Sequence, residues 1–434
     1  MAQNKSKSLL IKNGRLIDPA AGIDAPMDVL LRDGRVVEVA PTGKIHGGSD
    51  ETFDAKGSIV APGFIDLHVH LREPGQSYKE TIATGTAAAA AGGFTSVCCM
   101  PNTVPVADSP EWVTWMQQPE RGAVVNVFPI AAATQASKGA VLTDFRALQR
   151  AGAVAITDDG RPILSDAIMR DTLRVAAEIG LPVIQHAEDT RMTEHCSMNE
   201  GATSFRLGLR GMKTASEASI VERDIQLAQQ FTGSRLHVAH LSTADALKAV
   251  RRAKRDKVRA TCEVTPHHFA LTDEAVGEYD TNFKMNPPLR SAEDREALMI
   301  ALADGTVDAI ATDHAPHAVH EKSVEFERAA FGINGLETAV GLALTELLSK
   351  RKIPLPRIVE LFTAGPARVV DLTGRGTLVA GSHADVTIFD PKKRWAFVGA
   401  KSRSLSRNTP FDGWQFTGKV LATIVAGRIV YRAG

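Results

Sequence analysis

Histidine and aspartate residues recur at one place in the sequence pattern, the end of a short apolar segment. His68 and His70 end FIDLHVHL, His186 follows PVIQ, His240 follows RLHVA, and Asp313 follows VDAIAT. Residues two apart in a strand point to the same side, and two imidazoles on one side form a zinc-type ligand pair. Any one of these residues is equally well explained as a buried, hydrogen-bonded side chain. Their recurrence at the same end of successive segments favours a metal site.

The segments that carry these residues belong to a longer alternating pattern. Eight short apolar segments alternate with stretches of helical character, such as 166–179 and 216–230, where apolar residues recur at steps of three and four. Near-continuous apolar strands are typical of a parallel sheet that is buried on both faces. We therefore predict an α/β fold, a (β/α)₈ TIM-type barrel over residues 61–374, in which the carboxyl ends of the strands meet at one mouth. The eight segments are FIDLHVHL, TSVCCMP, VNVFPIAAAT, AVAITDD, PVIQHAE, RLHVAHLS, VRATCEVTPHH and VDAIATDHAP.

Both ends of the chain have a different pattern, with short alternating segments and many turn residues. Asn13-Gly14 and Asp33-Gly34 are typical hairpin turns. The last sixty residues return to the same style in ADVTIFD and GKVLATIVAGRIVYR. We expect residues 1–60 and 375–434 to pair into one small composite β domain, similar to a β-sandwich.

Composition excludes several classes of protein. The 434 residues include 50 Lys and Arg against 50 Asp and Glu, so the formal net charge is zero, which argues against a nucleic-acid partner. Lys5 and Lys7 precede only three apolar residues, far fewer than an export signal needs. The uncharged stretch 81–107 is interrupted by Gly92-Gly93 and Pro101, so we interpret it as a buried helix and strand and expect no membrane association. Four cysteines without zinc-site spacing indicate reduced thiols and a cytoplasmic protein.

Three motifs identify the chain as similar to a known family. GFIDLHVHLREPG, TSVCCMPNT and ATDHAPH resemble the amidohydrolase superfamily of metal-dependent barrel hydrolases, and within it the dihydroorotases of the larger bacterial type. The resemblance covers nearly the whole chain. It implies zinc-dependent, reversible cyclisation of N-carbamoyl-L-aspartate to (S)-dihydroorotate plus water, the third step of de novo pyrimidine (UMP) biosynthesis, with a metal-bridging hydroxide as the nucleophile.

The resemblance also assigns metal ligands. One or two Zn²⁺ ions are implied per subunit, with two expected, and Asp313 is both associated with the metals and the general acid/base. Many superfamily members use a carboxylated lysine as the bridge, but no lysine occurs between Lys138 and Lys213. An aspartate is the implied bridge, Asp159 by alignment to the family motif, with Asp158 as the alternative. The implied ligands are His68, His70, Asp159, His186, His240 and Asp313.

Substrate contacts are implied at six further positions. Arg72 lies two residues after His70, so it faces the barrel if the strand continues, and its guanidinium can hold a carboxylate with two hydrogen bonds. Two alternatives stay open: Arg72 as a surface charge, and Asn286 as a turn residue before Pro287. The implied contacts are Arg72, Asn102, Asn286, His317 and the backbone of Phe331 and Gly332.

The sequence is also compatible with two other functions. A different cyclic amidohydrolase, such as an allantoinase or hydantoinase, is one alternative, and a non-catalytic partner of aspartate transcarbamoylase is another. The family also implies a homodimer and association with aspartate transcarbamoylase. Residues 318–330, rich in charge, fit either a mobile lid or a solvated helix. His267 and His268 are interpreted as structural.

Overall fold

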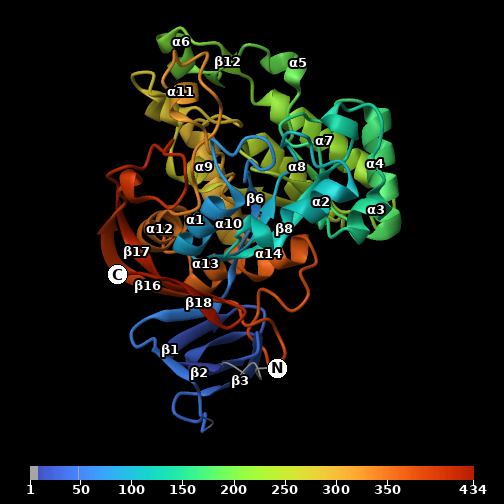
Figure 1. Cartoon of the computed structure of the whole chain (residues 1–434). Helices are drawn as coiled ribbons and strands as arrows, with labels where there is room; N and C mark the ends of the chain where they lie inside the picture. The colour runs from blue at the N-terminus through green and yellow to red at the C-terminus, as the bar shows by residue number, and fades with distance from the viewer. Residues whose placement is uncertain (1–7, 47) are drawn as a thin grey trace.

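The computed structural model describes residues 8–46 and 48–434, and it consists of a barrel joined to a β-rich part built from both ends of the chain (Figure 1). The first seven residues, which include Lys5 and Lys7 of the export-signal prediction, lie outside this range. Each of the eight predicted barrel strands is present, and neighbours along the chain pair in parallel. The strands are β6 (Phe64–Val69), β7 (Phe94–Cys99), β8 (Asn126–Ala132), β9 (Ala155–Thr157), β10 (Val183–Gln185), β13 (Leu236–Val238), β14 (Ala260–Val264) and β15 (Ala309–Ile310).

The barrel closes between its first and last strands. Val69 and His314 form a parallel bridge, and the His70 N–H donates to the His314 carbonyl at 2.9 Å. Most residues of these strands are buried, as both faces of such a sheet require. Closure brings residues that follow β6 next to residues that follow β15, so His70 and Asp313 become neighbours although 243 positions separate them.

Helices surround the barrel, and the two predicted ones are confirmed (Figure 1). In α4, Ser165 accepts a hydrogen bond from the Ile168 N–H, a local reason for the helix to begin there. Between β11 (Met198–Asn199) and β12 (Gly211–Met212) lies α6. The helices are α1 (Ile82–Gly92), α2 (Pro110–Met116), α3 (Phe145–Arg150), α4 (Asp166–Ile179), α5 (Thr190–Thr193), α6 (Ala202–Leu207), α7 (Ala215–Ala228), α8 (Ala244–Arg255), α9 (Pro266–Ala270), α10 (Ala292–Asp304), α11 (Val319–Lys322), α12 (Ala339–Leu342) continued by a π-helix (Ala343–Lys350), α13 (Leu355–Phe362) and α14 (Ala364–Val369).

The uncharged stretch 81–107 folds as predicted, into α1 followed by β7. Thr81 caps α1 through the Thr84 N–H, and Gly93 ends it with a φ of 93°. Within the described residues, we find no helix with the length and apolarity that crossing a membrane requires.

Strands from the two ends of the chain share one sheet. Its order is β18-β17-β16-β5-β1-β2-β3, with β4 beside β1, and the two ends meet where β16 pairs antiparallel with β5. This is the β-rich terminal part that the sequence predicts, whereas the bounds 1–60 and 375–434 stay a prediction. The strands are β1 (Ser8–Asp18), β2 (Ile23–Arg32), β3 (Arg35–Pro41), β4 (Glu51–Asp54), β5 (Ile59–Pro62), β16 (Val386–Ala396), β17 (Gln415–Val425) and β18 (Arg428–Arg432).

The hairpin prediction is right at one turn and wrong at the other. Asp33-Gly34 connects β2 to β3, with positive φ at both residues. Asn13-Gly14 instead forms a bulge inside β1, because the Asn13 N–H donates to Asp28 at 2.9 Å rather than turning the chain. Glycine is needed at position 14 because a Cβ there would lie 2.5 Å from a methyl group of Val60. A two-residue turn motif does not distinguish a hairpin from a bulge.

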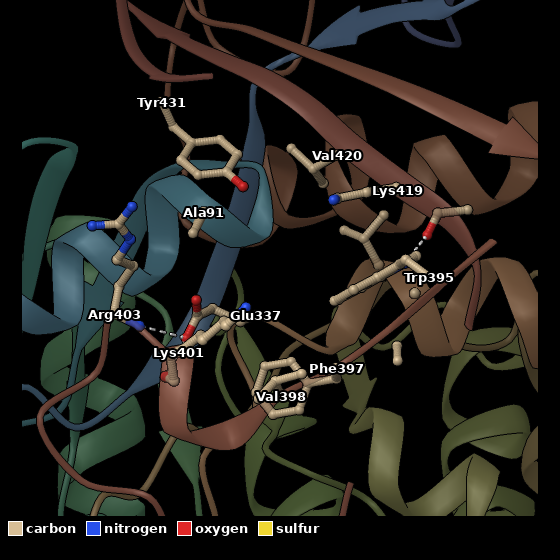
Figure 2. Close-up of a pocket in the computed structure, with 15 residues that line it drawn as sticks. Ala91, Glu337, Trp395, Phe397, Val398, Lys401, Arg403, Lys419, Val420 and Tyr431 are labelled. Atoms are coloured by element: carbon tan, nitrogen blue, oxygen red, sulfur yellow. Dashed lines mark hydrogen bonds between the residues drawn. The ribbon is translucent and has the colours of Figure 1, made fainter. Parts of the chain in front are cut away.

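A cavity of about 330 Å³ separates the terminal sheet from the barrel (Figure 2). Trp395, Phe397 and Tyr431 line it from the sheet side, and Glu337 from the barrel side. The Glu337 carboxylate accepts hydrogen bonds from the Ser402 hydroxyl and, at 3.0 Å, from the Arg403 N–H. These bonds attach the segment between β16 and β17 to the barrel, and that segment continues to the barrel mouth at Asn408.

Candidate active site

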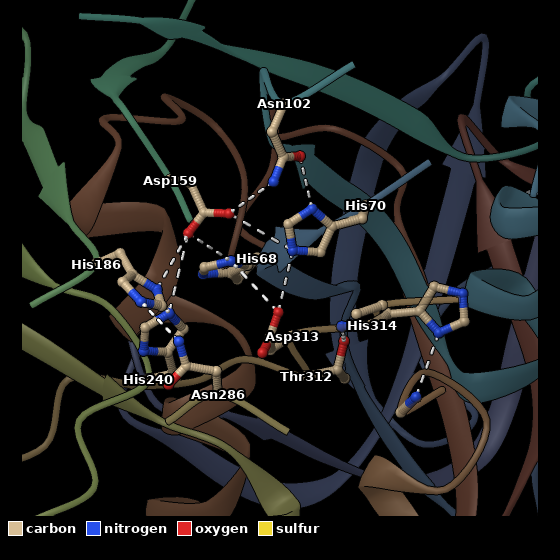
Figure 3. A network of polar contacts seen from close by, with 12 residues as sticks. His68, His70, Asn102, Asp159, His186, His240, Asn286, Thr312, Asp313 and His314 are labelled. Carbon is tan, nitrogen blue, oxygen red and sulfur yellow. Dashed lines mark hydrogen bonds and ion pairs between the residues drawn. The ribbon is translucent and has the colours of Figure 1, made fainter. Parts of the chain in front are cut away.

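Four histidines surround one carboxylate at the barrel mouth (Figure 3). Asp159 follows β9, and its Oδ1 lies 3.4 Å from His68 Nε2, 3.8 Å from His186 Nδ1 and 4.0 Å from His240 Nε2. Its Oδ2 lies 3.6 Å from His70 Nε2. All five side chains are buried. Residues from four strand ends therefore converge on a single point, as the barrel geometry requires.

The cluster divides into two possible metal sites that share Asp159. His68, His70 and Asp159 form one group and Asp159, His186 and His240 the other, each with ligand atoms within 4.8 Å of one another. His68 Nε2 is buried and has no hydrogen-bond partner among the described residues. Imidazole nitrogens and a carboxylate are the ligands that zinc prefers. The residues therefore fit two divalent ions bridged by one carboxylate.

The neighbouring Asp158 lies outside this cluster. Its carboxylate accepts hydrogen bonds from the Thr134 N–H at 3.0 Å and from the Thr134 hydroxyl. The two adjacent aspartates thus face opposite ways, as expected for consecutive residues in an extended chain. Of the two alternatives that the sequence left open, only Asp159 lies among the histidines.

Asp313 lies beside the first histidine pair. Its Oδ1 is 3.1 Å from His70 Nε2 and 3.5 Å from His68 Nε2. The backbone of Asp313 has a φ of 48°, a conformation that few non-glycine residues adopt, so the chain turns sharply as it leaves β15. This turn directs the carboxylate toward the cluster, where it is a second acidic group beside His68 and His70.

Charge distribution explains the protonation of the cluster. Burial alone would raise the pKa of Asp159, but His68, His70 and His186 outweigh it and hold that pKa well below its usual range. Burial likewise opposes a charge on His68, but Asp159 and Glu263 raise its pKa well above the ordinary value. Asp159 is therefore an ionised carboxylate among imidazole nitrogens, a donor set that suits a cation.

Two glutamates that the sequence analysis did not single out support the histidines. Glu263 in β14 lies 3.2 Å from His68 Nδ1, and Glu188 lies 2.9 Å from His186 Nε2. A carboxylate behind a histidine fixes its ring and its tautomer. An acidic residue inside the apolar segment VRATCEVTPHH was the available signal for Glu263, whereas Glu188 had none beyond its closeness to His186.

A cavity of about 250 Å³ opens beside the cluster. Each of the six residues predicted to contact substrate lines it, together with most of the predicted metal ligands. The lining residues are His70, Arg72, Asn102, Asp159, Gly160, His186, His240, Asn286, Asp313, Ala315, His317, Phe331 and Gly332.

Arg72 reaches this cavity by a route that differs from the predicted one. β6 ends at Val69, and Arg72 has a φ of 60°, so the alternation of a strand does not continue to it. The side chain is 8% exposed, its Nε donates to the Pro316 carbonyl at 3.1 Å, and its Nη2 lies 3.3 Å from His317 Nε2. These contacts contradict the surface-charge alternative.

The two asparagines contact the cluster directly. Asn102 connects His70 with Asp159, with Oδ1 2.9 Å from His70 Nδ1 and Nδ2 donating to Asp159 at 3.2 Å. Asn286 Nδ2 donates to Glu188 at 2.8 Å. Both amides line the cavity, so Asn286 does more than shape a turn before Pro287.

His317 lies beside Arg72 in the lining of the cavity. His317 Nε2 lies 2.9 Å from the Phe331 carbonyl. Burial lowers the pKa of His317 to about 3, and the charges of Arg72 and Lys79 add to the effect. His317 is therefore neutral at pH 7, and the Arg72 guanidinium beside it favours an anionic group in this part of the cavity.

The remaining histidines near the mouth have structural contacts. His268 lies 2.7 Å from the Thr265 hydroxyl and 3.0 Å from the Pro287 carbonyl. His314 lies 3.3 Å from Glu80 and accepts from the Gly335 N–H. These contacts agree with the structural interpretation of His268 and leave the described cluster to the four histidines above.

Comparison with known proteins identifies the family to which the chain belongs. Residues 57–246 match the model of a family described as dihydro-orotase-like. Proteins named dihydroorotase from Solibacter usitatus and from Geobacter sp. strain M21 are 51% and 50% identical to the chain, covering 96% and 98% of it and 97% and 100% of their own lengths. The chain belongs to the dihydroorotase family. It is an enzyme of the cyclic amide hydrolase type, as its motifs predicted.

Solved structures confirm the architecture. An L-hydantoinase (dihydropyrimidinase) from Arthrobacter aurescens superposes with a TM-score of 0.87 at 25% identity, covering 98% of this chain and 96% of its own. A dihydropyrimidinase from Brevibacillus agri superposes with a TM-score of 0.83 at 23% identity, covering 98% and 95%. The barrel with an attached β-rich part is thus a fold that this dihydroorotase-family chain has in common with both.

Proposed function

We propose that the barrel mouth catalyses the reversible interconversion of N-carbamoyl-L-aspartate and (S)-dihydroorotate. The observation that carries the proposal is the placement of Arg72, a buried guanidinium in the same 250 Å³ cavity as the histidine cluster. Dihydroorotate combines a hydrolysable ring amide with a carboxylate, so it needs both a hydrolytic centre and a carboxylate-binding group. The family membership supports the same substrate.

We infer that two Zn²⁺ ions are held by the cluster, with Asp159 shared between them. Metal ions in such a site lower the pKa of water and polarise the scissile carbonyl. The shared carboxylate and the unpartnered His68 Nε2 support this assignment. Glu263 and Glu188 would hold the histidine rings in their binding orientation. The assigned ligands are His68, His70, Asp159, His186 and His240, with Asp313 associated.

Asp313 is assigned the proton transfers. In the hydrolytic direction its carboxylate accepts a proton from the attacking water and then delivers it to the departing amide nitrogen. In the cyclisation direction the same carboxylate takes the proton from that nitrogen as it bonds to the carboxyl carbon, and then delivers it to the oxygen that leaves as water. Its position 3.1 Å from His70 supports this role, because the attacking water must lie near both groups.

Arg72 is assigned the substrate carboxylate, which its planar guanidinium can bind through two hydrogen bonds. Asn102 and Asn286 lie between the cluster and the cavity, where their amides can orient the ring. The backbone of Phe331 and Gly332 closes the opposite side, with His317 between it and Arg72. The substrate thus lies with its carboxylate at Arg72 and its amide at the cluster.

Turnover of three substrates tests this function. The purified enzyme, loaded with zinc, is assayed with dihydroorotate, allantoin and dihydrouracil. We expect turnover of dihydroorotate to exceed that of the other two, because only dihydroorotate presents a ring carboxylate to Arg72. Good turnover of allantoin without dihydroorotate activity would instead establish the alternative cyclic amidohydrolase, and no turnover of any would favour the non-catalytic partner.

We also infer a cytoplasmic homodimer that associates with aspartate transcarbamoylase, on the basis of the family alone. Light scattering of the purified chain, with and without aspartate transcarbamoylase, tests both associations. A mass of one chain, unchanged on mixing, would contradict them.

A further inference from the structure

Two buried lysines lie behind the Phe331–Gly332 wall of the cavity. Lys322, the last residue of α11, is 6% exposed, and its Nζ donates to three main-chain carbonyls. The acceptors are those of Lys284 at 3.2 Å, Ala330 at 2.9 Å and Gly332 at 3.0 Å. One ammonium group thus joins three points of the chain, one of which lines the cavity.

Lys284 secures the same segment from another side. Its side chain is almost fully buried, and Nζ donates to the carbonyls of Phe326 at 2.7 Å and Glu327 at 2.9 Å. The ammonium also lies 4.3 Å from the centre of the Phe331 ring, and the Lys284 carbonyl accepts from the Gly332 N–H at 3.0 Å. Lys284 is therefore bonded to the segment 322–332 at two places: at Phe326 and Glu327, and at Gly332, which lines the cavity.

Burying these charges opposes their ionisation. Burial lowers the pKa of Lys322 to about 7 and that of Lys284 to about 8. Neither ammonium forms an ion pair with a described residue, although Asp280 and Glu321 lie near enough to favour the charge on Lys322. Buried lysines are costly unless their donors are satisfied, so main-chain carbonyls replace the usual carboxylate partner here.

Gly332 has one further support. Its carbonyl also accepts from Asn408 Nδ2 at 3.1 Å, and Asn408 donates to the Ala315 carbonyl and accepts from the His317 N–H. Asn408 belongs to the segment between β16 and β17, far from Lys322 in sequence. Two side chains thus meet at one carbonyl of the wall that faces the substrate.

We propose that Lys322 is a positioning residue for substrate recognition: with Lys284 and Asn408 it holds the Phe331–Gly332 backbone at the distance that closes the carboxylate-binding side of the cavity. The inference rests on the proposed function of that cavity. Phe331 and Gly332 line the cavity and belong neither to the assigned metal ligands nor to the proton-transfer group, so their displacement should weaken substrate binding more than it slows the reaction step.

Lys322→Met tests the proposal, since methionine keeps the length of the side chain and removes its donors. We expect KM for dihydroorotate to rise about tenfold or more, the effect of losing a charge-assisted hydrogen bond, with kcat changed less than about threefold and zinc content unchanged. Lys352→Met is the matched control, because Lys352 donates to the Ser349 carbonyl at 2.6 Å on an exposed surface. The control should leave KM unchanged.

Asn408→Ala and the double variant keep the proposal falsifiable if Lys322→Met folds poorly. Both side chains donate to the Gly332 carbonyl, so we expect Asn408→Ala to raise KM as well. In the variant that carries both substitutions, the rise in KM should differ from the product of the two single effects. Hydrogen exchange of the amides in 326–332 should be faster in Lys322→Met and unchanged in Lys352→Met.

The outcomes separate this inference from the function on which it rests. Wild-type enzyme that does not turn over dihydroorotate would overturn the proposed function. Active wild type, with an unchanged KM and unchanged amide exchange in folded Lys322→Met or an unchanged KM in Asn408→Ala, would overturn the positioning role alone. A fall in kcat or zinc content with KM constant would overturn it too.

Discussion

The two sides of the substrate cavity are supported by different kinds of contact. On the metal side, side chains at strand ends are supported by buried carboxylates, such as Glu263 behind His68. On the recognition side, Arg72, His317 and the Phe331–Gly332 backbone belong to loops. Main-chain carbonyls contact the Arg72 and His317 side chains, and the Lys322 ammonium and the Asn408 amide donate to Gly332. The metal ligands at the strand ends are held in place by the sheet itself. The recognition side is instead held in place by contacts between segments that are distant in the sequence.

The two sides also differ in charge. Burial would raise the pKa values of Glu263 and Glu188, but the histidines that they contact lower both to about 2, so these carboxylates stay charged at any working pH. On the recognition side, burial, reinforced by the charges of Arg72 and Lys79, lowers the pKa of His317 to about 3 and keeps it neutral. Arg72 on this side offers a positive charge and paired donors to the anionic end of a bound molecule.

The largest effect is expected on the metal side, at the group assigned to proton transfer. Asp313→Asn preserves shape but removes the base, so kcat should fall by about 10²–10⁴-fold, the usual contribution of general acid–base catalysis. Zinc content and KM should change little, because the histidines and Asp159 are untouched. Steady-state kinetics with metal analysis make the comparison, and near-normal kcat would remove Asp313 from the mechanism.

Removing a support on the metal side should have an intermediate effect. Glu263→Gln weakens the hydrogen bond that orients His68, so zinc affinity should fall by about 10–100-fold. Glu222→Gln is the matched control, because Glu222 pairs only with Arg252 on the surface. Competition with a zinc chelator measures both. Equal zinc affinities in the two variants would show that the Glu263 carboxylate does not support the metal side of the cavity.

The smallest effect is expected on the recognition side. Arg72→Lys keeps the charge but loses the planar pair of donors, so KM for dihydroorotate should rise about tenfold while kcat changes little. Arg146→Lys, at an exposed ion pair with Glu178, should leave KM unchanged. If Arg72→Lys altered kcat and zinc content instead, the division between the two sides would be wrong.

Sequence patterns predicted the metal side better than the recognition side, for a physical reason. His68, His186, His240 and Asp313 follow apolar strands, and parallel strands end at one mouth, so their convergence follows from the pattern. Arg72 was predicted to face the cavity through continued strand geometry, yet it reaches there through a left-handed turn.

The supports of the recognition wall had no such pattern. Asn408 and Lys322 contact Gly332 through loops whose path depends on tertiary packing. The same limit applies to Asn13-Gly14, where local turn residues form a bulge because β1 pairs with strands on both sides. Contacts that depend on packing between distant segments cannot be predicted from a local sequence pattern.

Zinc binding by the two adjacent aspartates tests the central claim most directly, since one is assigned to both metal sites and the other to neither. Wild type and Asp158→Asn should each bind about two zinc ions per chain at saturation, whereas Asp159→Asn should bind fewer and lose dihydroorotate turnover. Thermal melting of each variant confirms that it is folded. Two tightly bound zinc ions in folded Asp159→Asn, or loss of zinc only in Asp158→Asn, would contradict the account.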